Sequence, residues 1–314
     1  MNRIPCYSIS TFFTSSTRSG NDAANKIREK VLETIITPPI EYLQDTDYGH
    51  LWQHVHNEWN TIIDKIIDRQ LYSRIELKIL AGRGNNHDGN LICSSNTIDR
   101  MDRIVKIEFK YGGTSICSIP QFLSLQTNQP TLKMFDEPYD IFYYNHYIDL
   151  YIACDPVGIT ETKPSMEIYL KCVRSTDYTI HPFFAQLKER ENIAKLNKNK
   201  VVNDSIRDYL VRYAHSIDTA QLTQKIKQTQ QDKIYLLWSN QKFHLDEIHI
   251  NSIQNIEFAA IGDKGNVIQL RAGVGIHRLA FHMLLRWRNH KGILNPAWQI
   301  SMKRCIVNDI DTTT

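Results

Sequence analysis

The chain has 314 residues, which is too long for one minimal domain and enough for one large domain or for a core with a smaller lobe. Its 42% hydrophobic and 23% charged residues are typical of a globular protein and exclude disorder along the whole chain. The 37 basic and 34 acidic side chains leave a net charge of +3, which argues against a uniformly basic surface but permits a local basic cleft.

The cysteines and the N-terminus place the protein in a broad class. Six scattered cysteines form no Cys-x-x-Cys pair and no Cys/His cluster, so neither a disulfide framework nor a structural zinc site is predicted. No apolar run reaches the roughly 18 residues that a membrane helix needs. The first 20 residues lack the apolar core of a signal peptide. We therefore expect an intracellular, cytoplasmic protein without a membrane partner.

The first half of the chain begins with helical spacing and then changes to the alternation of strands. Residues 1–20 are rich in Ser and Thr and are predicted to form a loose arm. Helices are predicted over Asn21–Ile36 and from about Asp47 to Gln70. The strands that follow are predicted over Ser73–Ala81, Leu91–Cys93 and Arg103–Tyr111. Pro120 suits the first position of a helix, which is predicted over Gln121–Gln126.

The second half repeats this order of helices followed by strands. The aromatic-rich segment Glu137–Cys154 favours a helix, with a strand as the alternative, and two polar-faced helices follow at Phe183–Asn197 and Asp204–Gln231. Short strands are predicted over Ile234–Trp238, Phe243–Ile250, Ile256–Ile261 and Asn266–Arg271. A helix over Ile276–Arg288 and a strand over Ala297–Lys303 end the pattern.

This order of elements predicts an α/β, or α+β, fold with a mixed central β-sheet flanked by helices. The predicted parts are a loose arm over 1–20, a core over 21–160, a helical insertion over 161–232 and a β-rich C-terminal part over 233–314 that completes the core.

The strand over Arg103–Tyr111 places a carboxylate and lysines on one face. Because side chains alternate between the two faces of a strand, Glu108 and Lys110 are expected together, opposite Val105, Ile107 and Phe109. A hairpin with the preceding strand would bring Asp88 beside Glu108. Two close carboxylates form a hard-oxygen site for magnesium, and a lysine beside them can orient or deprotonate a water. The metal would polarise a phosphate and supply hydroxide, which is the chemistry of phosphodiester hydrolysis.

Asp88 followed by Glu108-Phe109-Lys110 resembles the Asp…(Asp/Glu)-x-Lys motif of the PD-(D/E)XK nucleases. The segments after it, Tyr111-Gly112-Gly113 and Ser118–Leu123, are similar to those of type II restriction endonucleases, as are residues 284–292 and 295–300. The resemblance implies a restriction-endonuclease-like fold and a magnesium-dependent endonuclease that hydrolyses double-stranded DNA at specific sequences. It also implies a homodimer and a cognate methyltransferase that acts on the same DNA site.

The resemblance assigns roles to particular residues. Asp88 and Glu108 would bind Mg²⁺, Lys110 would activate or position the water, and Gln121 would support the site from the next helix. The family's helix acid would be Glu58 or Asp64. The family usually has proline before its first acid, whereas His87 stands there, so Asp99 and Asp102 are alternatives to Asp88.

Glu-x-Lys is a short pattern, and it occurs at two further places in the chain. These are Glu76-Leu77-Lys78, which has no strand acid upstream, and Glu161-Thr162-Lys163, in a polar loop. Glu108 and Lys110 could also form no more than a surface ion pair, which would stabilise the fold little. The alternative functions are a structure-selective or repair nuclease of the same superfamily and a non-catalytic DNA-binding protein.

Basic and aromatic residues are interleaved over Ile276–Lys291. On a helix, Arg278, His282 and Arg286 would share one face, because they recur every fourth residue. Together with Arg288 and Lys291 they are expected to contact DNA phosphates or guanine edges. The alternative is a solvated basic face on a helix whose apolar residues pack the core.

Overall fold

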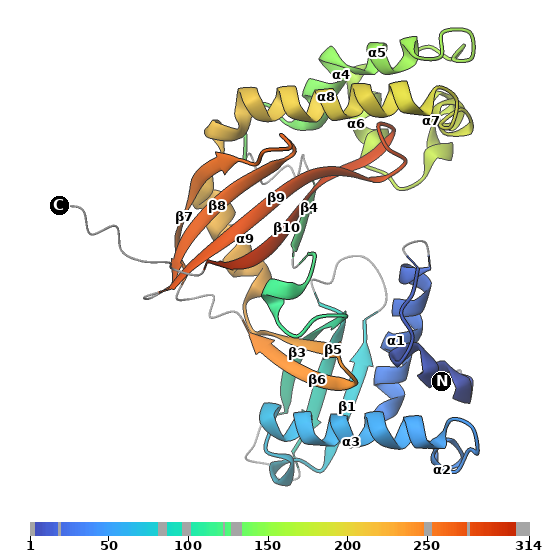
Figure 1. The fold of residues 1–314 in the computed structure, drawn as a ribbon, viewed down its shortest axis with the longest axis vertical. Coiled ribbons are helices and arrows are strands. Elements are labelled where there is room, and N and C mark those ends of the chain that lie inside the picture. The colour runs from blue at the N-terminus through green and yellow to red at the C-terminus, as the bar shows by residue number, and fades with distance from the viewer. Residues whose placement is uncertain are drawn as a thin grey trace, which may run out of the picture. The chain divides into compact units, whose positions relative to one another are not determined.

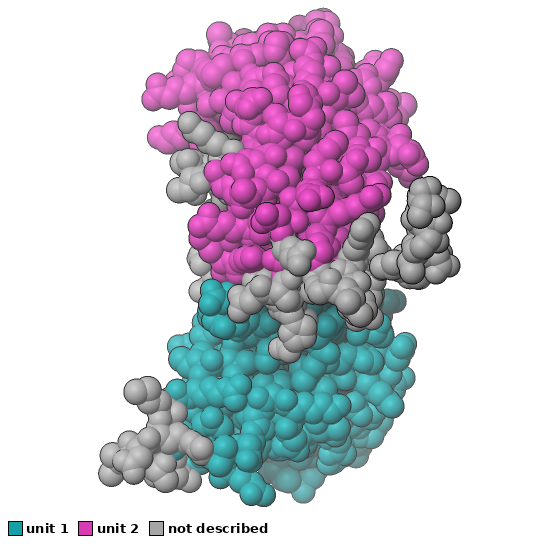
Figure 2. Space-filling view, turned by 90° about the vertical axis from the view of Figure 1, so that its left-hand side faces the viewer, with its two compact units in different colours: residues 1–119, 229–250 teal, residues 120–228, 251–314 magenta. Residues whose placement is uncertain are grey.

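A computed structural model describes residues 4–17, 20–80, 87–95, 102–121, 123–126, 134–247, 253–274 and 277–305. The chain divides into two compact units, residues 1–119 with 229–250 and residues 120–228 with 251–314 (Figure 2). Each unit contains a five-stranded sheet. The unit boundaries lie at 119/120, 228/229 and 250/251, and so differ from the predicted divisions at 160/161 and 232/233.

The first unit is built around a mixed sheet with the strand order β1-β2-β3-β5-β6 (Figure 1). Its strands are β1 (Arg74–Ile79), β2 (Gly89–Ser94), β3 (Arg103–Tyr111), β5 (Lys233–Ser239) and β6 (Lys242–Glu247). All neighbours are antiparallel except β3 and β5, which are parallel. The strand predictions in this region are confirmed.

One face of this sheet packs on helices. The helices are α1 (Asn21–Ile35), α2 (Ile40–Leu43) and α3 (Gly49–Ile66), with short 3-10 helices η1 (Cys6–Phe12), η2 (Arg69–Leu71) and η3 (Ile116–Ser118). Val105, Ile107 and Phe109 of β3 belong to the same buried core as the apolar face of α3. Glu108 and Lys110 alternate with them and therefore lie on the opposite face of the strand, as the sequence predicts.

The prediction of a loose N-terminal arm is wrong for η1. Ile9 and Phe12 are fully or almost fully buried in the core of the first unit. The Phe12 carbonyl accepts a hydrogen bond of 2.7 Å from the indole Nε1 of Trp238 in β5. The Ser- and Thr-rich composition hides these apolar residues, whose burial holds the segment in place.

In its described residues, the second unit pairs six helices with an antiparallel sheet of order β4-β10-β9-β8-β7. Its strands are β4 (Leu123–Gln126), β7 (Ile253–Ile261), β8 (Val267–Val274), β9 (His277–Asn289) and β10 (Leu294–Cys305). Its helices are α4 (Tyr139–His146), α5 (Ile148–Ala153), α6 (Met166–Val173), α7 (Pro182–Glu189), α8 (Lys195–Tyr213) and α9 (Thr219–Gln230), with η4 (Tyr178–Ile180) and η5 (Ala214–Ser216). The end of α9 lies in the first unit.

Aromatic side chains fill the space between these helices and the sheet. Tyr143 of α4 lies edge-on to Trp287 of β9 with ring centroids 5.0 Å apart, and Tyr209 of α8 lies near Trp298 of β10. The aromatic-rich segment is therefore helical, as favoured, and it packs the core. No helix among the described residues is long and apolar enough to cross a membrane.

Two predicted helices are strands in the structure. Gln121–Gln126 contributes β4, which pairs with β10, and Ile276–Arg288 contributes most of β9, which pairs with β8 and β10. Alternate residues of β9 are buried, namely Phe281, Met283, Leu285 and Trp287. Burial of every second residue, together with pairing to β8 on one side and β10 on the other, makes this segment a strand. The recurrence of basic residues at every fourth position had favoured a helix.

Candidate active site

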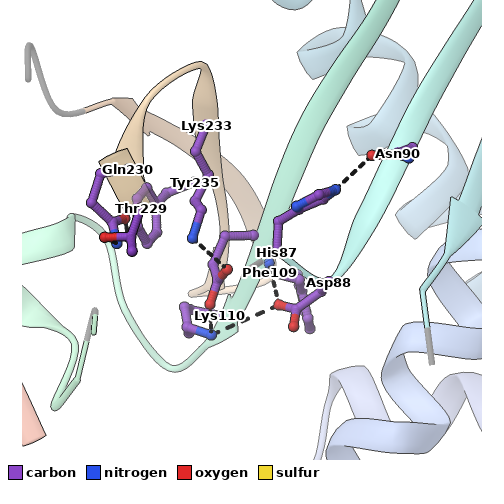
Figure 3. Close-up of polar contacts among 10 residues, drawn as sticks. His87, Asp88, Asn90, Phe109, Lys110, Thr229, Gln230, Lys233 and Tyr235 are labelled. Atoms are coloured by element: carbon purple, nitrogen blue, oxygen red, sulfur yellow. Dashed lines mark hydrogen bonds and ion pairs between the residues drawn. The ribbon is translucent and has the colours of Figure 1, made fainter. Parts of the chain in front are cut away.

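The hairpin of β2 and β3 brings Asp88 to Glu108. Asp88 directly precedes β2, where Gly89 pairs with Ile107, and its backbone N–H donates to the Ile107 carbonyl at 3.0 Å. Its carboxylate Oδ2 accepts a hydrogen bond of 2.8 Å from the backbone N–H of Phe109 (Figure 3). The predicted hairpin is therefore confirmed, and β3 itself orients the Asp88 side chain.

Lys110 lies between the two carboxylates. Its Nζ is 2.5 Å from Glu108 Oε1 and 3.7 Å from Asp88 Oδ2. The side chains of Lys110, Asp88 and Glu108 are 28%, 29% and 12% exposed, so the group is largely buried and still open to solvent. The structure thus joins the three residues that the motif singles out.

A second lysine, Lys233 at the start of β5, completes the group. Its Nζ lies 3.2 Å from Glu108 Oε2, and its side chain is only 3% exposed (Figure 3). Glu108 therefore binds one ammonium with each carboxylate oxygen. Sequence reasoning missed Lys233 because it lies 125 residues from Glu108. The signal was a lysine at the head of the apolar strand Ile234–Trp238.

Polar side chains of β5 and of the end of α9 lie beside this group, where Tyr235 pairs with Glu108 across the sheet. The hydroxyl of Tyr235 donates to Gln230 Oε1, and Gln230 Nε2 donates to Thr229 Oγ1 at 3.3 Å (Figure 3). Burial, together with the charges of Glu108 and Asp88, raises the pKa of Tyr235, so its phenol stays protonated and able to donate.

The structure places Gln121 in the second unit, two positions before β4 and on no helix. The prediction of a helix that carries this residue is wrong. In the first unit, the glutamine near the site is Gln230, at the end of the helix that precedes β5.

An acid from α1 also acts on the site. Burial raises the pKa of Glu29, and the nearby charge of Asp88 raises it further, while Lys110 lowers it. Of the two predicted helix acids, Asp64 pairs with Arg69 at 2.5 Å. Glu58 lies on α3, whose apolar residues pack in one core with Val105, Ile107 and Phe109, on the face of β3 opposite Glu108. Glu29, which lies in the predicted helix over Asn21–Ile36, is thus an acid of α1 whose pKa responds to Asp88 and Lys110.

Of the alternatives to Asp88, Asp99 lies outside the described residues. Asp102 immediately precedes β3, where its carboxylate accepts a hydrogen bond of 3.1 Å from the backbone N–H of Ser95. Six residues of extended strand, about 20 Å, separate Asp102 from Glu108. Asp88 is therefore the partner of Glu108.

The protonation of the two lysines differs. Burial opposes the charge on Lys110, but the carboxylates of Glu108 and Asp88 outweigh it and raise the pKa of Lys110. Burial dominates at Lys233 and lowers its pKa, although Glu108 acts in the other direction. Burial also raises the pKa of Asp88, against the attraction of Lys110. Lys110 is thus the stable cation of the group.

The carboxylates of Asp88 and Glu108 fit a magnesium ion. Both converge on the single ammonium of Lys110, so one cation can contact both. Magnesium binds through one or two carboxylates and retains several waters. No group of three or more His, Cys, Asp or Glu side chains suited to a metal occurs in the described part of the chain. Carboxylate oxygens are the ligand type that magnesium prefers, whereas zinc sites usually include nitrogen or sulfur ligands.

Four of the five predicted DNA-contact residues lie on β9. Arg286 and Arg288 are exposed and His282 is partly exposed, whereas the side chain of Arg278 is outside the described residues. Lys291 follows β9, and its Nζ donates to Asn203 Oδ1 at 2.8 Å. The predicted shared face exists on a strand, because a spacing of four is also a multiple of two.

Comparisons with known proteins identify no relative. A scan against family models matches none, and a search among curated proteins finds no significant match.

Proposed function

We propose that this chain is a magnesium-dependent endonuclease of the PD-(D/E)XK type that hydrolyses phosphodiester bonds in double-stranded DNA. The observation that supports the proposal is the convergence of Asp88 and Glu108 on Lys110 across neighbouring strands. Two carboxylates and a cation in one half-buried group match the demands of phosphodiester hydrolysis, which needs a metal, a positioned water and a charge to offset the developing negative charge.

Each residue of the group has a part in this reaction. Asp88 and Glu108 would hold magnesium, which supplies polarisation of the phosphate and a water of lowered pKa. The Phe109 N–H holds the Asp88 carboxylate in place, and Lys233 holds Oε2 of Glu108. Lys233 is a positioning residue, because it acts through Glu108.

Lys110 acts as a cation in this proposal. Its raised pKa keeps the ammonium protonated near neutral pH, so it donates hydrogen bonds to the attacking water or to a phosphate oxygen. It also offsets negative charge that develops in the transition state.

The proposal extends to a restriction-type enzyme with sequence-specific cleavage, a homodimeric state and a cognate methyltransferase. These features rest on the resemblance of the motif and of the segments after it.

The test is plasmid cleavage with magnesium by the wild type and by E108Q. The matched control is E76Q, which changes the same residue of a Glu-x-Lys pattern on β1 of the same sheet. We expect E108Q to lose at least about 100-fold in rate, since even the loss of outer partners of metal ligands costs 10- to 100-fold. We expect E76Q to cleave like the wild type. Cleavage by folded E108Q at the wild-type rate would overturn the site.

The products separate the candidate functions. Defined fragments from a long duplex support sequence-specific cleavage. Cleavage only at branches or ends supports a structure-selective or repair nuclease. No cleavage, with a DNA affinity that magnesium does not alter, supports a non-catalytic DNA-binding protein.

A further inference from the structure

The antiparallel sheet of the second unit has one buried and one open face. Along β9, the buried residues Phe281, Met283, Leu285 and Trp287 alternate with residues that are exposed or partly exposed. Arg286 and Arg288 are exposed, and His282 is partly exposed. Because side chains alternate along a strand, these three lie on the face away from the helices.

Strand register extends this face over the neighbours of β9. Residues directly opposite in an antiparallel pair point to the same side of the sheet. Ser301 of β10 and Gln269 of β8 both lie opposite His282. The cationic residues of this face, which we call the basic sheet face, are Arg271, Arg286, Arg288 and Lys303; its polar residues are Ser124, Gln269, His282, Gln299 and Ser301.

Charge on the basic sheet face is strongly unbalanced. In the described parts of the five strands, Glu257 is the single acidic residue, and it lies at the edge on β7, opposite Arg271. Burial and the positive charge of Lys303 lower the pKa of His282, which places these two residues in one positive field.

Hydrogen bonds along the sheet orient the two arginines of β9. Arg286 Nη1 donates to Gln299 Oε1 at 2.7 Å, and Arg288 Nη1 donates to Ser124 Oγ at 3.4 Å. A guanidinium has five N–H donors, and contacts of this kind hold it ready for phosphate oxygens. The two residues are about 7 Å apart along the strand, or twice the rise per nucleotide of a DNA strand.

Aromatic side chains indicate which nucleic acid this face would bind. Sheets that bind single strands present rings on which bases stack. The rings of β9 and β10 lie on the buried side instead: Phe281, Trp287 and Trp298 are each at most 8% exposed. Among the residues that the structure describes, the open face therefore offers charge and amides but no Phe, Tyr or Trp ring on which bases could stack.

We propose that the basic sheet face binds double-stranded DNA through its phosphates. The choice of DNA as the partner rests on the proposed nuclease function. The surface itself lies entirely in the second unit. The arginines and lysine of this face would contact phosphates, while Gln269 has the amide chemistry that reads adenine edges.

The test is the affinity for a short fluorescein-labelled duplex, measured by anisotropy in EDTA so that no cleavage occurs. We compare the wild type with R286A/R288A and with R207A/R212A, which removes two exposed arginines of α8 in the same unit. We expect R286A/R288A to bind at least about 10-fold more weakly, with a salt slope smaller by about 1.8, since each phosphate contact contributes about 0.9. The control should stay within about twofold of the wild type, because it leaves the phosphate contacts of the face intact.

A second pair, R271A/K303A, tests the same face from β8 and β10 and should also weaken binding. The proposal is overturned if both face variants bind duplex DNA like the wild type, or if the wild type prefers the single strand or an RNA duplex. E108Q keeps the two proposals apart. If E108Q cleaves DNA while the face variants lose binding, the active-site proposal is wrong and the proposal for the basic sheet face is supported. If E108Q is inactive while the face variants bind normally, the active-site proposal is supported and the proposal for the basic sheet face is wrong.

Discussion

Two strands of the first sheet carry the same Glu-x-Lys pattern, but the glutamates differ in exposure and in their partners. On β1, an edge strand, Glu76 is 46% exposed and pairs with Arg74 two residues away. On β3, a central strand, Glu108 is 12% exposed and binds Lys110 and Lys233. Asp88 reaches the second group from β2.

The difference comes from the neighbours of each strand. A central strand receives side chains from both sides, so Glu108 gains an acid from β2 and a lysine from β5. An edge strand has only one such neighbour, and its charges remain a local pair in water, which stabilises little. The surroundings of a Glu-x-Lys pattern therefore decide whether it can support chemistry.

D88N should have the largest effect. It removes an acid for which the Glu-x-Lys pattern of β1 has no equivalent. Magnesium should raise the melting temperature of the wild type, because it binds the folded state, and should not raise that of D88N. Cleavage should fall by at least about 100-fold. A D88N protein that magnesium still stabilises like the wild type would remove Asp88 from the metal site.

K233M should have the next largest effect. Removing one partner of a buried ion pair leaves charge uncompensated, so we expect the free energy of unfolding to fall by about 3 kcal/mol in denaturant titrations. K78M on β1 is the control and should change it by less than about 0.5 kcal/mol. Equal stability of K233M and K78M would contradict the burial argument.

E29Q should reduce cleavage by roughly 10-fold, because it removes a charge that acts on Asp88 and Lys110 from outside the pair of carboxylates. E33Q, on the same helix, is the control. Steady-state rates at fixed magnesium measure the effect. An E29Q rate equal to that of E33Q would mean that α1 supplies no acid to the site.

The smallest effect belongs to E76Q, which breaks the exposed pair with Arg74. We expect the free energy of unfolding to change by less than about 0.5 kcal/mol. A loss of unfolding free energy near that of K233M would show that the charges of the edge strand stabilise the fold as much as those of the central strand. That result would contradict the difference between the two strands.

The part of the site that sequence could predict is the local part. Strand alternation places Glu108 and Lys110 together, and one hairpin adds Asp88. Lys233 and Gln230 could not be found this way, because the parallel pairing of β3 with β5 joins segments that are 125 residues apart. Periodicity predicts which side chains share a face of a strand, but not which distant strand pairs with it.

Errors in the fold have a similar origin. A four-residue recurrence fits a helix and a strand equally well, so only pairing with β8 and β10 decides the conformation of β9. Gln121 was assigned to a helix because Pro120 suits a helix start, whereas pairing of Leu123–Gln126 with β10 overrides that local preference. In both places tertiary pairing outweighs local propensity.

The parallel pairing of β3 with β5 has a consequence for biosynthesis. A ribosome must translate most of the second unit before it reaches the lysine that holds Glu108. A polypeptide that terminates early can contain Asp88, Glu108 and Lys110 and still lack Lys233 and the strand beside them. Closing so long a loop costs more conformational entropy than closing the hairpin of β2 and β3, so we expect this pairing to form after the hairpin. A fragment that ends before β5 would therefore lack the complete group of charges that the proposed function uses.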